Sequence, residues 1–142
     1  MSPKTRKNRS KKEMRNAPVE QQIVIRFMEL LNTVKIFHWK TTSYPTHKAT
    51  DDLHSELSSG IDKFVEIMLG KHGGRVNLSS VKTIEFKDFS TIESFKTEIN
   101  GYKEYLKSFN TMFDASNDSD LLNIRDELLG NLNQFTYLLT FH

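Results

Sequence analysis

Apolar residues recur at intervals of three and four along four segments of the chain, and this periodicity limits the fold more than any other feature. Each segment presents one continuous apolar stripe at helical spacing, so we expect four amphipathic helices. They cover residues 16–42, 45–71, 90–113 and 121–139. The longer crossover over residues 75–88 has no strong pattern, and we expect one turn of helix within it. The sequence therefore predicts an all-α fold, a four-helix bundle with a longer connection between its second and third helices.

Capping residues mark the ends of the predicted helices. Ser43 or Tyr44 precedes a proline suited to the first turn of the second helix, and Gly73 is a plausible C-cap for the same helix. Ser90 and Glu93 have the spacing of a capping box that opens the third helix. Glycines inside the predicted helices are explained equally by close helix packing and by tolerated neutral positions. These are Gly60, Gly101 and Gly130.

Composition bounds the class of protein. The chain has 142 residues, 37% of them hydrophobic, which is enough for one core of ordinary size. It has no cysteine, so disulfides and thiolate metal sites are excluded. No apolar run is long enough to span a membrane, and no segment has the pattern of a signal peptide. We expect an intracellular protein, without distinguishing cytoplasm, nucleoid, nucleus or virion.

The charge of the chain is segregated. Residues 1–16 carry seven basic residues and one acidic residue, a net charge of +6, whereas residues 17–142 have 13 basic and 17 acidic residues, a net charge of −4. We expect a disordered basic arm over residues 1–16 and one domain over 17–142. The arm suits non-specific contact with nucleic-acid phosphates, and a solubilising tail or a targeting signal would have the same composition. The seven basic residues are Lys4, Arg6, Lys7, Arg9, Lys11, Lys12 and Arg15.

A polar stripe on the second predicted helix points to metal chemistry. Spacings of three, four and seven place its members on one helical face, beside a separate apolar stripe. The polar stripe consists of His47, Asp51, His54, Ser58, Asp62 and Glu66. Imidazole and carboxylate ligands suit iron and zinc. Taken one at a time, Asp62 and Glu66 are more typical of an exposed acidic pair, and His47 and Asp51 of the first turn of a helix. His38, on the preceding helix, is by itself more typical of a hydrogen-bonded core histidine than of a metal ligand.

The spacing along this stripe requires a second copy of the chain. His47 and Asp62 are 15 residues apart, which on a straight helix is roughly 22 Å, so they cannot share a metal within one chain. If the helix packs antiparallel against its twin, Asp62 and Glu66 of one copy approach His38, His47 and Asp51 of the other. A two-fold axis would create two such sites at once.

This pattern resembles the ferroxidase signature of the Dps family of mini-ferritins. The resemblance covers roughly residues 19–70 and rests on His38, Trp39, His47, Asp51, Asp62 and Glu66. It implies a ferritin-like subunit that assembles into a hollow shell, by analogy a dodecamer. It also implies iron sites at two-fold interfaces, with zinc as a substitute, and Fe(II) oxidation by peroxide or dioxygen. The basic arm is similar to one that some members use to bind DNA.

The resemblance also implies roles for the matching residues. His38 and His47 would bind iron as neutral imidazoles, and Asp51 would bind the metal or orient a histidine. Glu66 would bind iron and Asp62 would bind or bridge it. The residue beside the centre, in the catalytic position, is Trp39. Two alternatives stay open: a ferritin-like protein that compacts DNA or is structural, with a weak or absent ferroxidase activity, and a helical oligomer without chemistry.

Overall fold

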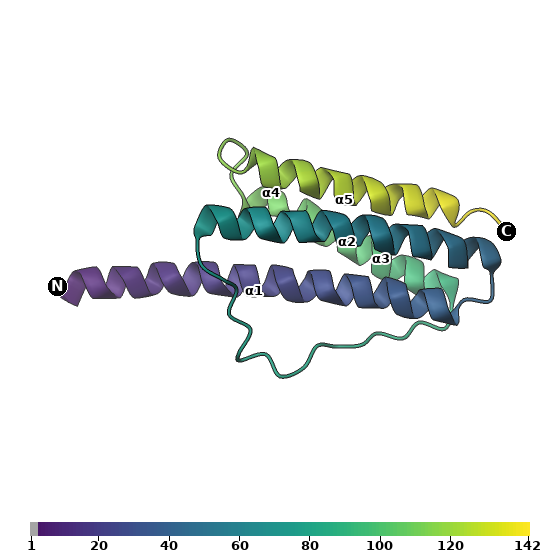
Figure 1. The fold of residues 1–142 in the computed structure, drawn as a ribbon, viewed down its shortest axis with the longest axis horizontal. Coiled ribbons are helices and arrows are strands. Elements are labelled where there is room, and N and C mark those ends of the chain that lie inside the picture. Colours follow the sequence, from purple (N-terminus) through teal and green to yellow (C-terminus); the bar gives the residue numbers. More distant parts are fainter. Residues whose placement is uncertain (1–2) are drawn as a thin grey trace.

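The computed structural model describes the backbone of residues 3–142 and the side chains of residues 19–142 (Figure 1). Its elements are α1 (Pro3–Lys40), α2 (Tyr44–His72), α3 (Ile92–Lys107), α4 (Phe109–Met112) and α5 (Ser119–Leu138). Over residues 3–142 the backbone contains no strand, which confirms the all-α prediction. The predicted arm falls on residues 1–16, whose side chains lie outside the described part, so its disorder and its seven DNA-contacting residues stay predictions.

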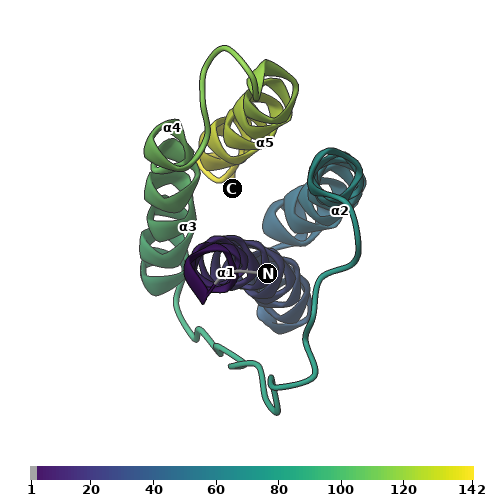
Figure 2. The same ribbon diagram turned by 90° about the vertical axis from the view of Figure 1, so that its left-hand side faces the viewer.

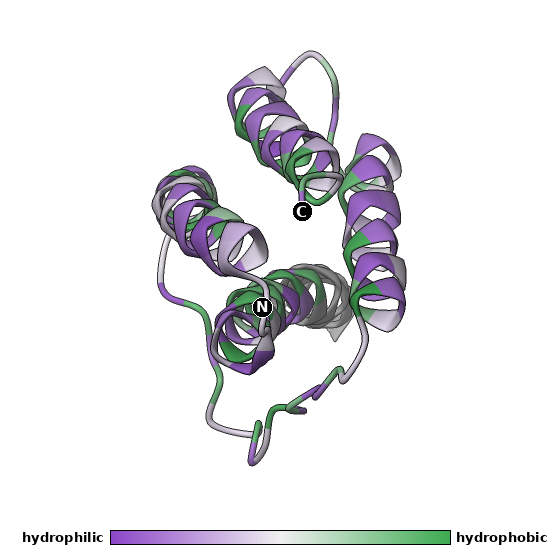
Figure 3. Cartoon of the chain, turned by 90° about the vertical axis from the view of Figure 1, so that its right-hand side faces the viewer, coloured by the Kyte–Doolittle hydropathy of each residue, from purple (hydrophilic) through white to green (hydrophobic). Residues whose placement is uncertain are grey.

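The four long helices enclose one core. α2 packs between α1 and α5, and α3 packs against α5 on the other side of the bundle (Figures 1 and 2). Apolar residues gather on the helix faces that look toward the middle (Figure 3). Aromatic rings from three helices meet there, with the Phe27 and Phe64 centroids 5.4 Å apart and those of Phe64 and Phe109 5.5 Å apart. Edge-on and tilted ring contacts of this kind stabilise a core beyond simple area burial.

A three-residue turn, residues 41–43, joins α1 to α2. Ser43 is the N-cap, and its hydroxyl accepts a hydrogen bond from the Thr46 backbone N–H at 3.4 Å. At the other end of α2, Gly73 has a φ of 78° and its N–H donates to the Leu69 carbonyl at 2.8 Å. Both ends of α2 are therefore close to their predicted positions, and Ser43 rather than Tyr44 is the cap.

The connection between α2 and α3 differs from the prediction. Residues 73–91 contain no helix. The expected turn of helix in the crossover is reduced to one hydrogen-bonded turn, in which the Val81 N–H donates to the Leu78 carbonyl at 3.0 Å. The segment is held instead by side chains of the helices it passes. The Gln21 amide donates to the Asn77 carbonyl at 3.1 Å, and Lys40 lies 3.0 Å from Asp88. Figure 2 shows the connection sweeping around the outside of α1 to reach α3.

The third predicted helix begins and ends differently. Its N-cap is Thr91, whose hydroxyl accepts from the Ser94 N–H at 3.2 Å, so the expected capping box at Ser90 and Glu93 is wrong. The Thr91 hydroxyl thus accepts from the N–H of Ser94, one residue beyond the Glu93 N–H that the predicted capping box would have used. Helix α3 stops at Lys107, and the predicted continuation is the separate short helix α4.

The helical glycines divide into two kinds. A Cβ atom on Gly60 would lie 2.6 Å from Cδ2 of Leu128, so a larger residue there would force the buried Leu128 side chain to shift. Gly101 and Gly130 have open space around the same position. In the described part of the chain, no helix is both long and apolar enough to cross a membrane.

Candidate metal centre

The turn between α1 and α2 brings His38 and His47 into contact. His38 lies on the last turn of α1 and is only 8% exposed, whereas His47 lies on the first turn of α2 and is exposed. Their rings stack, with centroids 3.9 Å apart and planes inclined by 18°. The capped three-residue turn fixes this pairing, because it sets the last turn of α1 against the first turn of α2.

Each histidine is oriented by the main chain of the other. Nδ1 of His38 donates to the His47 carbonyl at 2.8 Å, and Nδ1 of His47 donates to the His38 carbonyl at 3.0 Å. A carbonyl oxygen only accepts hydrogen bonds, so both Nδ1 atoms carry the proton. In the neutral rings, Nε2 then has the free lone pair. This is the arrangement that second-shell carbonyls impose on metal-binding histidines.

Thr50 completes the support of His38. Its hydroxyl donates to the Thr46 carbonyl at 2.8 Å and lies 3.0 Å from Nδ1 of His38. The hydroxyl hydrogen is engaged with the carbonyl, so its oxygen accepts a second, shared bond from the imidazole. Among the described residues, no hydrogen bond is formed by Nε2 of His38, which leaves this nitrogen available.

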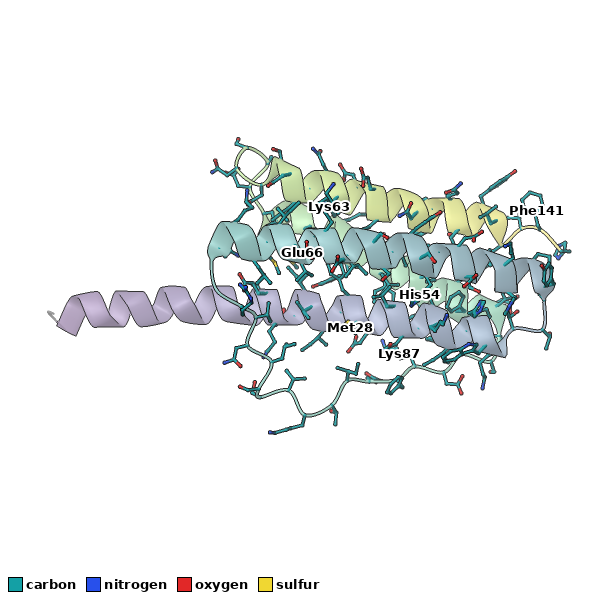
Figure 4. All side chains as sticks on the ribbon, viewed as in Figure 1. Met28, His54, Lys63, Glu66, Lys87 and Phe141 are labelled. Carbon is teal, nitrogen blue, oxygen red and sulfur yellow. The ribbon has the colours of Figure 1, made fainter. Side chains whose placement is uncertain are left out.

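The predicted carboxylate ligands stand in a different setting. Asp51, Asp62 and Glu66 are all exposed on α2, and within residues 19–142 none of them forms an ion pair or accepts a side-chain hydrogen bond. α2 is one uninterrupted helix, so Asp62 lies roughly 22 Å along the axis from His47. Figure 4 places Glu66 and His54 on the side of α2 that borders α1, and Lys63 on the edge that faces α5.

One subunit brings together part of the predicted ligand set. Over the described residues, no group of three or more His, Cys, Asp or Glu side chains converges closely enough to hold a metal ion. His38 and His47 meet, whereas Asp62 and Glu66 lie further along α2. The imidazoles fit a borderline metal such as iron or zinc, and a complete site needs oxygen ligands from outside this pair.

Two aromatic residues flank the histidines at the surface. Trp39 is 70% exposed, and the Lys35 ammonium lies 5.6 Å from its ring centre. Tyr44 is 74% exposed, with its ring centre 6.4 Å from that of His47. The sequence singled out Trp39 but not Tyr44. Tyr44 could have been predicted to lie near His47, because it comes one turn before His47 on the same helix.

His54 belongs to the same surface, although the predicted ligand set omitted it. It is half-buried beside α1. Burial lowers its pKa, as does the nearby charge of Lys35 and, more weakly, that of His38, while Asp51 acts in the opposite direction. This environment favours the neutral form of the His54 imidazole. Its membership of the polar stripe was the available signal.

Comparison with known proteins gives a family and no activity. The model of a family of unknown function, DUF5856, matches residues 38–139, a span that begins at His38 and includes α2, α3, α4 and α5. No curated protein and no solved structure matches the chain. Because the family match covers well over half of its length, the chain belongs to the DUF5856 family.

Proposed function

We propose that this protein binds and oxidises Fe(II) at sites shared between two copies of the chain and stores the ferric product inside a hollow oligomer. The observation that carries the proposal is the reciprocal bonding of His38 and His47, in which each Nδ1 is held by the main chain of the other residue. In both rings the proton is on Nδ1, which bonds to the protein, so the lone pair of Nε2 is free to bind a metal.

The remaining ligands would come from the second copy. Asp62 and Glu66 are one helical turn apart, exposed and without partners in the described part of the chain, so a second subunit can approach them. Two imidazoles from one subunit and two carboxylates from the other form a mixed nitrogen and oxygen set that suits Fe(II) and admits zinc as a substitute. Asp51, one turn from His47, supplies a further oxygen or orients a histidine.

Iron is the substrate in this proposal. Two Fe(II) ions each give up one electron to a peroxide, its O–O bond breaks, and hydrolysis yields ferric oxyhydroxide and protons; dioxygen is the alternative oxidant. Residues 17–142 carry a net charge of −4, which favours the arrival of cations. Trp39 lies beside His38 in the chain, at the rim where the second subunit would close the site.

Exposed apolar residues support an oligomer. Met28 is 44% exposed and Trp39 is 70% exposed, and both belong to α1, the helix beside the polar stripe of α2. Large apolar side chains left exposed on a helix that packs beside the candidate ligands favour burial by a partner. We propose a ferritin-like shell, a dodecamer by resemblance, built on two-fold contacts between these faces.

A second candidate function rests on charge. The seven basic residues within residues 1–16 favour non-specific binding to DNA phosphates, either alongside iron storage or as the main role of a compaction or structural oligomer. Deletion of residues 2–15 should then abolish the DNA gel shift at low salt. An undiminished gel shift after this deletion would show that residues 2–15 do not bind DNA.

Addition of Fe(II) and peroxide tests the iron proposal. We expect growth of ferric absorbance with the wild-type protein and its loss in His47→Ala and in Asp62→Ala. Lys63→Ala is the matched control, because Lys63 is exposed on α2 next to Asp62 but faces the α5 edge. Unchanged growth in both ligand variants would refute the proposal. Particle mass gives a second test, since a stable monomer is incompatible with a shared site.

A further inference from the structure

A pocket of about 500 Å³ lies at one end of the bundle. It is lined by the end of α1, the α1–α2 turn, the start of α3 and the segment after α5. Figure 1 shows these parts of the chain gathered at the same end of the molecule. None of the residues proposed to bind iron lines this pocket, so it is a separate feature. Its volume is in the range of sites that hold a small organic molecule.

The lining of the pocket is largely apolar. Two of its apolar side chains belong to the buried core, and three are only partly covered by the protein. They are Phe37 and Leu139 in the first group and Phe89, Ile92 and Phe141 in the second. Figure 4 shows Phe141 on the segment that follows α5. Aromatic side chains of this kind favour packing against a flat apolar ring.

The hydroxyl groups of the α1–α2 turn add hydrogen-bond donors to the pocket. The Thr41 hydroxyl accepts from the Ser43 N–H at 3.2 Å, and the Ser43 hydroxyl accepts from the Thr46 N–H at 3.4 Å. Neither hydroxyl donates to another atom of the described residues, so each has a hydrogen free for a ligand. Thr46 also lines the pocket and is only 7% exposed, yet its hydroxyl forms no hydrogen bond in the described part of the chain. Buried hydroxyls are usually hydrogen-bonded, so Thr46 indicates a polar occupant.

The charges of the pocket favour an anion with a single charge. Lys96 on α3 is partly buried and forms no ion pair among the described residues, whereas Lys40 lies 3.0 Å from Asp88. Glu93 is the one acidic side chain in the described lining, and it opposes a second negative charge on a ligand. The imidazole of His142, neutral or positive, does not repel an anion.

We infer that this pocket binds a small molecule with an apolar ring and one negatively charged oxygen group, such as an aromatic carboxylate. The ring packs against the aromatic side chains of the lining. The carboxylate accepts hydrogen bonds from the hydroxyls of the α1–α2 turn and from the Lys96 ammonium, and bonds between charged groups are the stronger kind. The inference does not depend on iron chemistry, because the two sites share no residue.

Fluorescence of anilinonaphthalene sulfonate, an aromatic probe with one negative charge, tests the inference on the full chain. We expect saturable binding that phenylbutyrate displaces. Phenylbutanol, which has the same ring without the charge, should displace the probe at least about tenfold less effectively, because it lacks the charged hydrogen bond. Phenyl phosphate, with its second charge, should also be less effective than phenylbutyrate. No displacement by phenylbutyrate, or equal displacement by phenylbutanol, overturns the inference.

Substitutions show whether the binding occurs in this pocket. Lys96→Gln should weaken phenylbutyrate about tenfold and leave phenylbutanol unchanged, whereas Phe141→Ala should weaken both about fivefold. Lys107→Gln is the matched control, because Lys107 is an exposed lysine on the same helix outside the pocket. Lys96 and Phe141 are both partly exposed, so we expect folded variants, and circular dichroism verifies this. Unchanged affinity in Lys96→Gln and Phe141→Ala, or an equal loss in Lys107→Gln, overturns the inference.

Discussion

The two ends of α2 present their candidate ligands in different ways. At the N-terminal end, His47 and its neighbour His38 are fixed within one chain by two hydrogen bonds from imidazole Nδ1 to a backbone carbonyl and by a stacked contact. Toward the C-terminal end, Asp62 and Glu66 stand on the surface of a regular helix with no partner among the described residues. The imidazole half-site is therefore a product of folding, whereas the carboxylate half-site acquires its geometry only on association. Substitutions of the histidines should consequently lower both stability and activity, whereas substitutions of the carboxylates should lower activity alone.

The largest separation is expected between His38→Ala and Asp62→Ala. His38→Ala removes a buried ring and its bond to the His47 carbonyl, so we expect a loss of about 2–4 kcal/mol in the free energy of unfolding. Asp62→Ala alters an exposed side chain and should change it by at most about 0.5 kcal/mol. Urea denaturation of the two variants under dissociating conditions measures the difference. Equal losses would contradict the contrast between the two ends.

A smaller effect is expected at Gly60 of α2, which lies between the half-sites and against Leu128 of α5. Gly60→Ala places a methyl group against the buried Leu128, and we expect a net loss of about 1–2 kcal/mol. Gly130→Ala is the matched control, since its added methyl group meets open space. It should stabilise the helix by about 0.5–1 kcal/mol. Thermal unfolding of the pair tests this, and a stabilising Gly60→Ala would mean that α2 is free to move away from α5.

The smallest effect concerns the support of the imidazoles. Thr50→Val removes the hydroxyl that contacts Nδ1 of His38 while keeping the side-chain shape. We expect a loss of about 1 kcal/mol in stability, and a loss of about tenfold in iron affinity because the ring is less firmly oriented. The control is Thr97→Val on α3, an exposed threonine whose hydroxyl likewise donates to a carbonyl one turn back, that of Glu93. Isothermal titration with Fe(II) under anaerobic conditions measures the iron affinity of both variants. Identical affinities would show that Thr50 does not support iron binding.

The helices and their order follow from the sequence because each segment buries one apolar stripe, and that stripe leaves a regular spacing of three and four. The ends of α2 were also predictable, since Ser43 and Gly73 have the local chemistry of caps. The connection over residues 73–91 was not, because its conformation depends on distant partners such as Gln21 and Lys40. The cap of α3 was misplaced by one residue, because Ser90 and Thr91 are both good caps.

Within the candidate site, the sequence identified the residue types and placed the two half-sites apart. It could not show that the short turn makes His38 and His47 orient one another, since that depends on the contact between two helix ends. His38 and His47 are only nine positions apart in the sequence. In the folded chain this short interval goes with direct ring stacking.

The most direct test of the shared site is complementation between two inactive variants. One carries His47→Ala and Asp51→Ala, the other Asp62→Ala and Glu66→Ala, and each alone should fail to oxidise Fe(II). When the two are co-assembled in equal amounts, half of the pairs are mixed and each mixed pair regains one of its two sites. We therefore expect about a quarter of the wild-type activity to return. A mixture that assembles normally but stays inactive would contradict a site shared across the two-fold axis.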